Sequence, residues 1–413
     1  VNLPAQAYAS SNLALSTTLL SPPGPINATS LMVASSCYSR TGMTSAPAQN
    51  DFDLRAQCPR WLSSHGPASP AAVLGALQQT AAAELAPDYY GVGGAVQALE
   101  AETGKLLGKP SASFVIKGMI AQTALLRTVT EARPGAVVVP KLGHMAVDEA
   151  DAIRHLLNAE VIELDAEQGF TEDDLAALDR PIAVCVVELP VRRAAYRLMP
   201  FSELQRISDW CRTNDVHLHI DGARLWEASA SYGVSLAEIG ALADTVYVSF
   251  YKGLGALAGA VLAGEQALLA RYAVWKKRFG GDLHTAYPFA ISALDGLEKR
   301  LPKMPGYLAR ARQLAAAFAA QGFEVVPAVP NVNAFQVILP GDPATLAEAN
   351  RTYARQTGIW LFNAFLPADK PGFARTEVVI GDAAEQYRDE EAVGWVQAMV
   401  AASSNLALPP GFP

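Results

Sequence analysis

The chain has 413 residues, of which 51% are hydrophobic and 17% charged, with a formal net charge of −8 at pH 7. This balance is typical of a globular protein that is long enough for two or three domains. The acidic net charge argues against a basic surface that binds nucleic acid or anionic lipid. No apolar stretch approaches the roughly 18 residues of a membrane span.

The N-terminal part is predicted to be an extension followed by helices. Residues 1–52 are rich in Ser, Pro, Asn and Ala with little periodicity, and we interpret them as an arm. From about Asp53 to Pro110, the spacing of apolar residues such as Val96 and Leu99 fits amphipathic helices.

Residues 53–300 are predicted to form a large domain. Apolar or β-branched runs indicate strands at 136–139, 160–164, 182–189, 216–220 and 245–250, and helices are expected at 148–157 and 201–212. Such alternation predicts an α/β fold with a mainly parallel sheet flanked by helices. Ligands of such sheets bind at the carboxyl ends of the strands.

Residues 301–413 are predicted to form a smaller C-terminal α/β domain. The pattern predicts helices at 304–318, 343–357 and 389–400, strands at 323–326, 334–339 and 375–380, and a loose tail at 406–413.

The four cysteines have neither C-x-x-C spacing nor a nearby pair of histidines, so we expect no metal site and no disulfide framework. Cys185 lies in the apolar run 182–189, where a buried, reduced thiol is the ordinary state. A cytoplasmic location is therefore expected.

Two motifs at strand ends carry the candidate chemistry. Asp221 ends an apolar strand and is followed by Gly-Ala-Arg, so its carboxylate needs a cation, either Arg224 or the protonated nitrogen of a pyridine cofactor. Lys252 follows the next strand and precedes Gly253 and Gly255. A desolvated lysine is a nucleophilic amine that forms Schiff bases, whereas Lys252 alone could be a solvated loop residue.

Together, these segments resemble the threonine aldolase branch, or β-eliminating lyases, of the aspartate-aminotransferase-like (fold type I) pyridoxal-phosphate enzymes. The family motifs H-x-D-G-A-R and S-x-x-K-G-L-G match 219–224 and 249–255, and the resemblance extends over about 53–400 through 90–94 and 114–119. It implies a large domain with a mainly parallel seven-stranded sheet and a smaller C-terminal α/β domain.

The resemblance also implies roles in holding pyridoxal 5′-phosphate. Lys252 would be the Schiff-base lysine and Asp221 the partner of the ring nitrogen. Backbone N–H groups at a helix start near Gly118 would bind the phosphate. Met119 stands where the family has threonine, and Ser249 is the candidate replacement.

Three histidines are further candidates. His144 matches the family histidine that stacks on the cofactor ring and is placed for proton transfer, although a surface histidine at a helix start is the alternative. His217 and His219 face the same side of a strand. Packing, or a phosphate-side contact by His219, is favoured over a metal pair because no third ligand is evident.

The substrate side departs from the family. In place of the family's Glu-Asn-Thr-His, the chain has Val191 where the histidine would stand, followed by Arg192, a candidate carboxylate anchor. The family's Leu-Arg-Ser-Asp is matched to 54–57, where the serine is missing. Arg375 matches the arginine that binds the substrate carboxylate, with an exposed arginine as the alternative.

The resemblance therefore predicts an aldolase-type lyase that cleaves a β-hydroxy-α-amino acid such as threonine, allo-threonine or phenylserine to glycine and an aldehyde. The alternatives are β-elimination, glycine transaldolation, and a catalytically inactive scaffold. Because fold type I sites lie across a dimer interface, a homodimer or homotetramer is expected, with the loop 91–94 and the arm reaching the neighbouring subunit.

Overall fold

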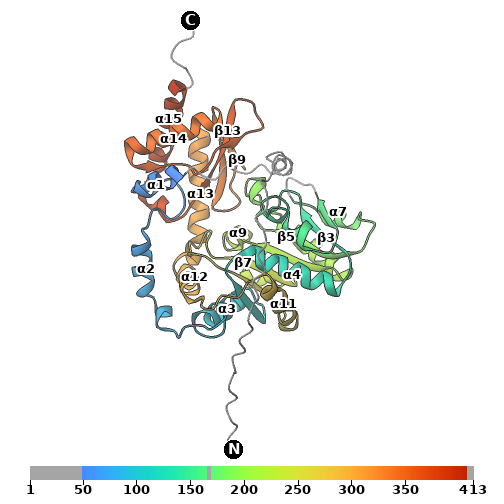
Figure 1. Ribbon diagram of the computed structural model, residues 1–413. Coiled ribbons are helices and arrows are strands. Elements are labelled where there is room, and N and C mark those ends of the chain that lie inside the picture. Colours follow the sequence, from blue (N-terminus) through green and yellow to red (C-terminus); the bar gives the residue numbers. More distant parts are fainter. Residues whose placement is uncertain (1–48, 165–168, 407–413) are drawn as a thin grey trace, which may run out of the picture. The chain divides into compact units, whose positions relative to one another are not determined.

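The computed structural model describes residues 49–164 and 169–406, and its central element is a seven-stranded sheet (Figure 1). The strand order is β2-β8-β7-β6-β5-β3-β4. The strands are β2 (Ser111–Val115), β3 (Ala136–Pro140), β4 (Val161–Leu164), β5 (Ile182–Glu188), β6 (His217–Gly222), β7 (Thr245–Ser249) and β8 (Ala260–Gly264). Neighbours from β4 to β7 pair in parallel, whereas β8 is antiparallel to both β7 and β2. The predicted mainly parallel seven-stranded sheet is confirmed.

Helices cover both faces of this sheet, which explains its continuous apolar strands. On one face, α4 (Gly118–Ala132) and α11 (Gln266–Arg278) pack with Val137 and Val139 of β3. Val138 points to the opposite face and joins a larger apolar cluster. Among the helices that contribute to this cluster are α3 (Gly94–Leu106), α8 (Phe201–Thr213), α9 (Leu225–Tyr232), α12 (Tyr287–Arg300) and α13 (Met304–Ala320).

Shorter elements connect these layers. They are α1 (Gln49–Gln57), α2 (Pro70–Gln78), η2 (Ala81–Glu84), α5 (His144–Val147), α6 (Ala152–Leu156), α7 (Glu172–Ala176), η3 (Arg192–Ala194), α10 (Leu236–Gly240) and η4 (Leu301–Lys303).

The C-terminal part contains a four-stranded antiparallel sheet in the order β12-β13-β10-β9. These strands are β9 (Glu324–Val326), β10 (Ala334–Pro340), β12 (Leu366–Pro367) and β13 (Phe373–Val379), accompanied by α14 (Pro343–Thr357), η5 (Asp382–Gln386) and α15 (Asp389–Leu406). Residues of β1 (Arg60–Trp61) pair in parallel with β11 (Ile359–Trp360), so the chain just after α1 is joined to this part.

Some sequence predictions need correction. The single helix predicted at 148–157 is wrong, because Ala150 and Asp151 adopt positive φ angles of 51° and 57°, which separate α5 from α6. Most of the predicted arm 1–52 and of the tail lies outside the described residues. The division into domains at 53–300 and 301–413 stays a prediction. Within the described ranges, no helix is both long and apolar enough to cross a membrane.

Candidate active site

A cavity of about 580 Å³ lies where the central parallel strands end. Glu188 at the end of β5 is paired in register with Asp221 of β6, and Asp221 is paired with Tyr247 of β7. Lys252 lies three residues after the last residue of β7. The wall contains seven of the predicted site residues, namely Gly118, Met119, His144, Arg192, Asp221, Arg224 and Lys252.

Lys252 is suited to act as a nucleophilic amine. Burial lowers its pKa to about 8, aided by the nearby positive charge of Arg224 and opposed by the negative charge of Asp221. The turn around it is fixed, since Gly255 N–H donates to the Lys252 carbonyl over 2.9 Å and Gly253 N–H donates to Glu227 Oε1 over 3.1 Å. A sizeable fraction of this amine is therefore unprotonated near neutral pH.

Asp221 is a buried carboxylate with an incompletely satisfied charge. It is 1% exposed, and its Oδ1 accepts a hydrogen bond from Ala223 N–H over 3.1 Å. Among the described residues, Oδ2 has no hydrogen-bond partner and no ion pair joins Asp221 to Arg224. The Arg224 guanidinium lies instead over the Tyr196 ring, 5.4 Å from its centroid. The simple Asp221–Arg224 ion pair considered from the sequence is thus not formed, and a cationic ligand would compensate this charge.

Glu188 links two turns at the edge of the cavity. Its carboxylate accepts from His144 N–H at 2.6 Å and from Arg192 N–H at 3.3 Å. Burial, together with the negative charge of Asp221, raises the pKa of Glu188 to about 7. No role for Glu188 was predicted from the sequence.

His144 is oriented by Glu149, which is itself 1% exposed. The two atoms His144 Nδ1 and Glu149 Oε1 are 2.9 Å apart. Because a carboxylate accepts, Nδ1 carries the proton and Nε2 is left to accept one. Burial acts to lower the pKa of His144, but the hydrogen bond to Glu149 and the charge of Asp221 outweigh it and raise the pKa. The imidazole is therefore a strengthened base.

Helix α4 begins at the cavity wall with Gly118 and Met119. A Cβ atom at Gly118 would lie 1.9 Å from the Tyr247 hydroxyl oxygen, so only glycine fits this position. The first N–H groups of a helix have no intrahelical acceptor and attract anions. This end of the cavity is thus suited to a phosphate.

Two predicted cofactor contacts lie outside the lining of this cavity. Ser249 Oγ donates to the Ala223 carbonyl over 2.7 Å. His219 is fully buried, with Nδ1 2.9 Å from Thr245 Oγ1 and Nε2 3.3 Å from Gln122 Oε1. Burial lowers the pKa of His219 to about 3, so it is neutral. These contacts support packing roles for both side chains.

His217 shares the Thr245 hydroxyl with His219, which confirms that both histidines face the same side of β6. No group of three or more potential metal ligands occurs within residues 49–164 and 169–406.

Arg375 lies in a neighbouring cavity of about 140 Å³, which shares Arg192 with the larger one. Ser63 and Ser64 line the same space. The Nε atom of Arg375 is buried without a hydrogen-bond partner, whereas Arg192 NH2 is 2.9 Å from Glu377 Oε2. Of the two predicted carboxylate anchors, Arg375 is thus the one with a hydrogen-bond donor that has no acceptor.

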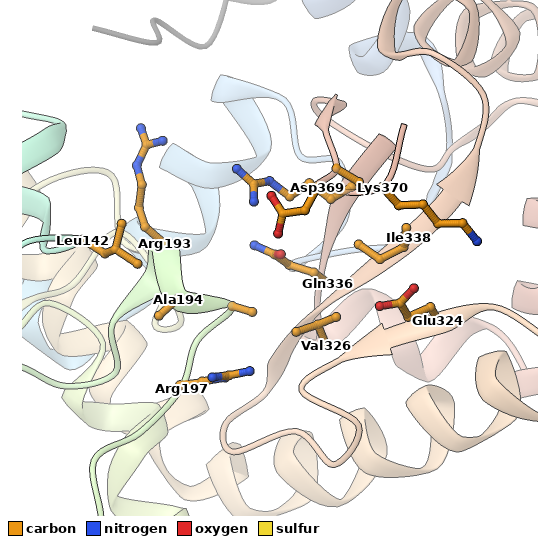
Figure 2. A pocket seen from close by; sticks show the side chains of 13 residues that line it. Leu142, Arg193, Ala194, Arg197, Glu324, Val326, Gln336, Ile338, Asp369 and Lys370 are labelled. Atoms are coloured by element: carbon orange, nitrogen blue, oxygen red, sulfur yellow. The ribbon is translucent and has the colours of Figure 1, made fainter. Parts of the chain in front are cut away.

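Arg375 also borders a third cavity, of about 390 Å³. Figure 2 shows this space between one segment with Arg193, Ala194 and Arg197 and another with Glu324, Val326, Gln336 and Ile338. The guanidinium of Arg193 is already paired with Asp148.

The serines near Arg375 were missed in the sequence. The segment 54–57, matched there to Leu-Arg-Ser-Asp, belongs to α1, and Leu54 packs on the cluster of Cys58 and Trp360. That match is wrong as a guide to the site, because Ser63 and Ser64 occupy the wall beside Arg375. The only local signal was a Ser-Ser-His-Gly turn after a two-residue strand.

Comparison with known proteins places this geometry in a family. The β-eliminating lyase family model matches residues 72–339. The crystal structure of a putative L-allo-threonine aldolase from Listeria monocytogenes EGD-E is similar with a TM-score of 0.78 and 33% identity, covering 85% of this chain and 98% of that one.

Curated relatives agree over a shorter span. The aldolase vrtJ of Penicillium aethiopicum is 32% identical over 220 residues, 51% of this chain and 56% of that protein. The low-specificity L-threonine aldolase of Candida albicans is 29% identical over 218 residues, 50% of this chain and 58% of that protein. The chain thus spans less than two thirds of the length of these relatives. The fold type I prediction is confirmed, and the chain belongs to the β-eliminating lyase family.

Proposed function

We propose that this chain is an aldolase-type lyase that cleaves a β-hydroxy-α-amino acid of the threonine, allo-threonine or phenylserine kind to glycine and an aldehyde. The observation that carries the proposal is the meeting of Lys252, Asp221 and His144 in one cavity. Membership of the β-eliminating lyase family makes the protein a pyridoxal-phosphate-dependent lyase.

The residues of the cavity fit pyridoxal 5′-phosphate, the cofactor of the protein. The partly unprotonated amine of Lys252 can bond the cofactor aldehyde. The second carboxylate oxygen of Asp221 can accept a hydrogen bond from the protonated pyridine nitrogen, and the start of α4 at Gly118 can hold the phosphate. Arg224 lines the same cavity as a further cation.

When bound, the cofactor supplies an electron sink for the negative charge that forms at the substrate Cα. Asp221 supports this role by keeping the ring nitrogen protonated. His144 takes the proton of the β-hydroxyl at Nε2, because Glu149 fixes the other nitrogen as a donor. Its raised pKa makes that transfer more favourable, and the missing histidine at Val191 leaves His144 as the proposed base.

Arg375 is proposed to hold the substrate carboxylate. Its unpartnered Nε and the hydroxyl groups of Ser63 and Ser64 offer donors in one small cavity. Arg192 forms a wall of both cavities, but its charge is balanced by Glu377. We therefore assign Arg192 to positioning Glu377 and Arg375 to substrate binding.

A homo-oligomer is proposed because apolar residues of the cavity rim remain exposed. Tyr251 and Leu257 line the cavity yet are 38% and 46% exposed, and in the separate loop 88–94 Tyr89 and Val92 are 64% and 75% exposed. A second copy would cover such side chains. The cytoplasm is the proposed location, since the cysteines of the described residues are free and buried.

Incubation of the full-length protein with threonine, allo-threonine and phenylserine, with detection of aldehyde and glycine, tests the proposal. Lys252→Ala serves as the matched control and is expected to abolish product formation. Pyruvate or ammonia from other amino acids, without any aldehyde, would establish β-elimination instead. Glycine consumption with a second aldehyde would indicate transaldolation. A chain that neither binds pyridoxal phosphate nor turns over any of these would be a scaffold.

A further inference from the structure

The turn that follows Lys252 is held from outside the cavity by two side chains that share one carboxylate. His65 Nε2 lies 2.9 Å from the Gly253 carbonyl oxygen, and Arg300 NH1 donates to the Leu254 carbonyl over 2.9 Å. Both side chains also contact Asp382, at 3.3 Å for His65 Nδ1 and 2.8 Å for Arg300 Nε. Two consecutive carbonyls after the lysine are therefore fixed.

The protonation state of His65 follows from these partners. A carbonyl only accepts, so Nε2 carries a proton and donates to Gly253. Nδ1 accepts from the backbone N–H of Asp382 over 3.3 Å. Burial and the charge of Arg300 lower the pKa of His65, which favours this neutral form despite the nearby carboxylate.

The ring of His65 is also tightly enclosed. Gly255 has a φ of 64°, and a Cβ there would lie 2.7 Å from His65 Cδ2. A Cβ at Gly381 would lie 2.9 Å from His65 Nδ1. The two glycines thus leave room for the imidazole and little else, which is consistent with a fixed orientation.

The same segment reaches the proposed substrate-carboxylate site. Ser63 and Ser64, directly before His65, line the cavity of Arg375. Ser64 N–H donates to the Val379 carbonyl of β13 over 2.7 Å, and Ser64 pairs with Ile380. One continuous run of three residues therefore joins the wall of that cavity to the lysine turn.

We propose that His65 is a positioning residue that fixes the turn after Lys252 and joins it to β13, the strand that carries Arg375. The inference rests on the proposed role of Lys252. Its consequence is that the amine and the carboxylate-binding strand keep a set separation, as a substrate held at both its amino and carboxylate groups requires.

The test uses full-length protein loaded with pyridoxal phosphate and compares His65→Leu with His65→Gln. Leucine fills the space without a donor, whereas the glutamine amide can donate to the Gly253 carbonyl. We expect His65→Leu to retain the cofactor about fivefold less tightly, as for the loss of one hydrogen bond, and to shift the midpoint of the pH titration of its visible absorbance. His65→Gln should recover most of both properties.

Lys303→Ala is the matched control, because Lys303 Nζ also bonds Asp382 over 2.9 Å but contacts no residue of the lysine turn in the described structure. Unchanged retention and midpoint in His65→Leu, or equal losses in His65→Leu and Lys303→Ala, would overturn the proposal. His65→Ala is a second donor-free variant should His65→Leu fail to fold. These readouts need no aldol cleavage, so an absence of aldolase activity in the unmodified protein would contradict the proposed function alone.

Discussion

Replacement of Glu188 by glutamine should change how the stability of the protein depends on pH. Burial and the charge of Asp221 raise the pKa of Glu188 from 4.5 to about 7 in the folded chain. A carboxyl group with a raised folded pKa binds its proton more tightly when folded. Its stabilising contribution is therefore complete below pH 4.5 and is lost as the pH rises through about 7.

The size of this effect follows from the two pKa values. One pH unit corresponds to about 1.4 kcal/mol per proton, so the contribution lost between pH 4.5 and about 7 is roughly 3 kcal/mol. Glutamine is neutral throughout and lacks this dependence. Relative to the unmodified protein, Glu188→Gln should thus gain roughly 3 kcal/mol in free energy of unfolding across that range.

Urea unfolding of both proteins at a series of pH values, without cofactor, measures this difference. The cofactor is left out because a protonated ring nitrogen beside Asp221 would alter the charge that Glu188 experiences. At low pH the free energies of unfolding of the two proteins should differ by a constant amount. The reason is that Glu188 accepts hydrogen bonds from two backbone N–H groups, and the NH2 group of glutamine would face one of them with a second donor. A difference that is the same at pH 5 and pH 8 would refute the reasoning.

Three further changes test the site. Glu149→Gln should lower the pKa of His144 and, because the base acts when unprotonated, move the acidic limb of the pH profile of kcat/KM to lower pH. An unmoved limb would exclude His144 as the catalytic base. Gly118→Ala should cost about 1–3 kcal/mol in free energy of unfolding and weaken cofactor binding, measured by thermal unfolding and absorbance titration, because its Cβ meets Tyr247; normal behaviour would contradict the packing. Ser63→Ala should raise KM about tenfold with little change in kcat, whereas a loss confined to kcat would place the substrate carboxylate elsewhere.

The core of the site could be predicted because its residues obey local rules. Asp221 lies near the end of one short apolar strand and Lys252 follows the next, and parallel neighbours end at the same edge of a sheet. The structure adds what spacing could not give, namely that Arg224 turns toward Tyr196 and that one oxygen of Asp221 has no partner among residues 49–164 and 169–406. A sequence motif shows which charges are near one another but cannot show how they pair.

The N-terminal contribution could not be predicted, for a different reason. Ser63, Ser64 and His65 follow a strand of only two residues, too short to give a periodic pattern. Their partners, including Gly253 and Asp382, are far away in the sequence. No periodic pattern around Ser63 and Ser64 therefore indicated that these residues, and not 54–57, lie beside Arg375.

The two candidate carboxylate anchors illustrate the same limit at the level of charge. From the sequence, both arginines were candidate carboxylate anchors, Arg375 through its match to the family position and Arg192 through its place after Val191. In β13, Arg375 and Glu377 are two residues apart and so lie on one face, where Glu377 pairs with Arg192. The strand thus neutralises one arginine while presenting the other with an unpartnered Nε. An incoming carboxylate would compete with Glu377 for Arg192 Nε and NH2, whereas Arg375 Nε has no partner to give up.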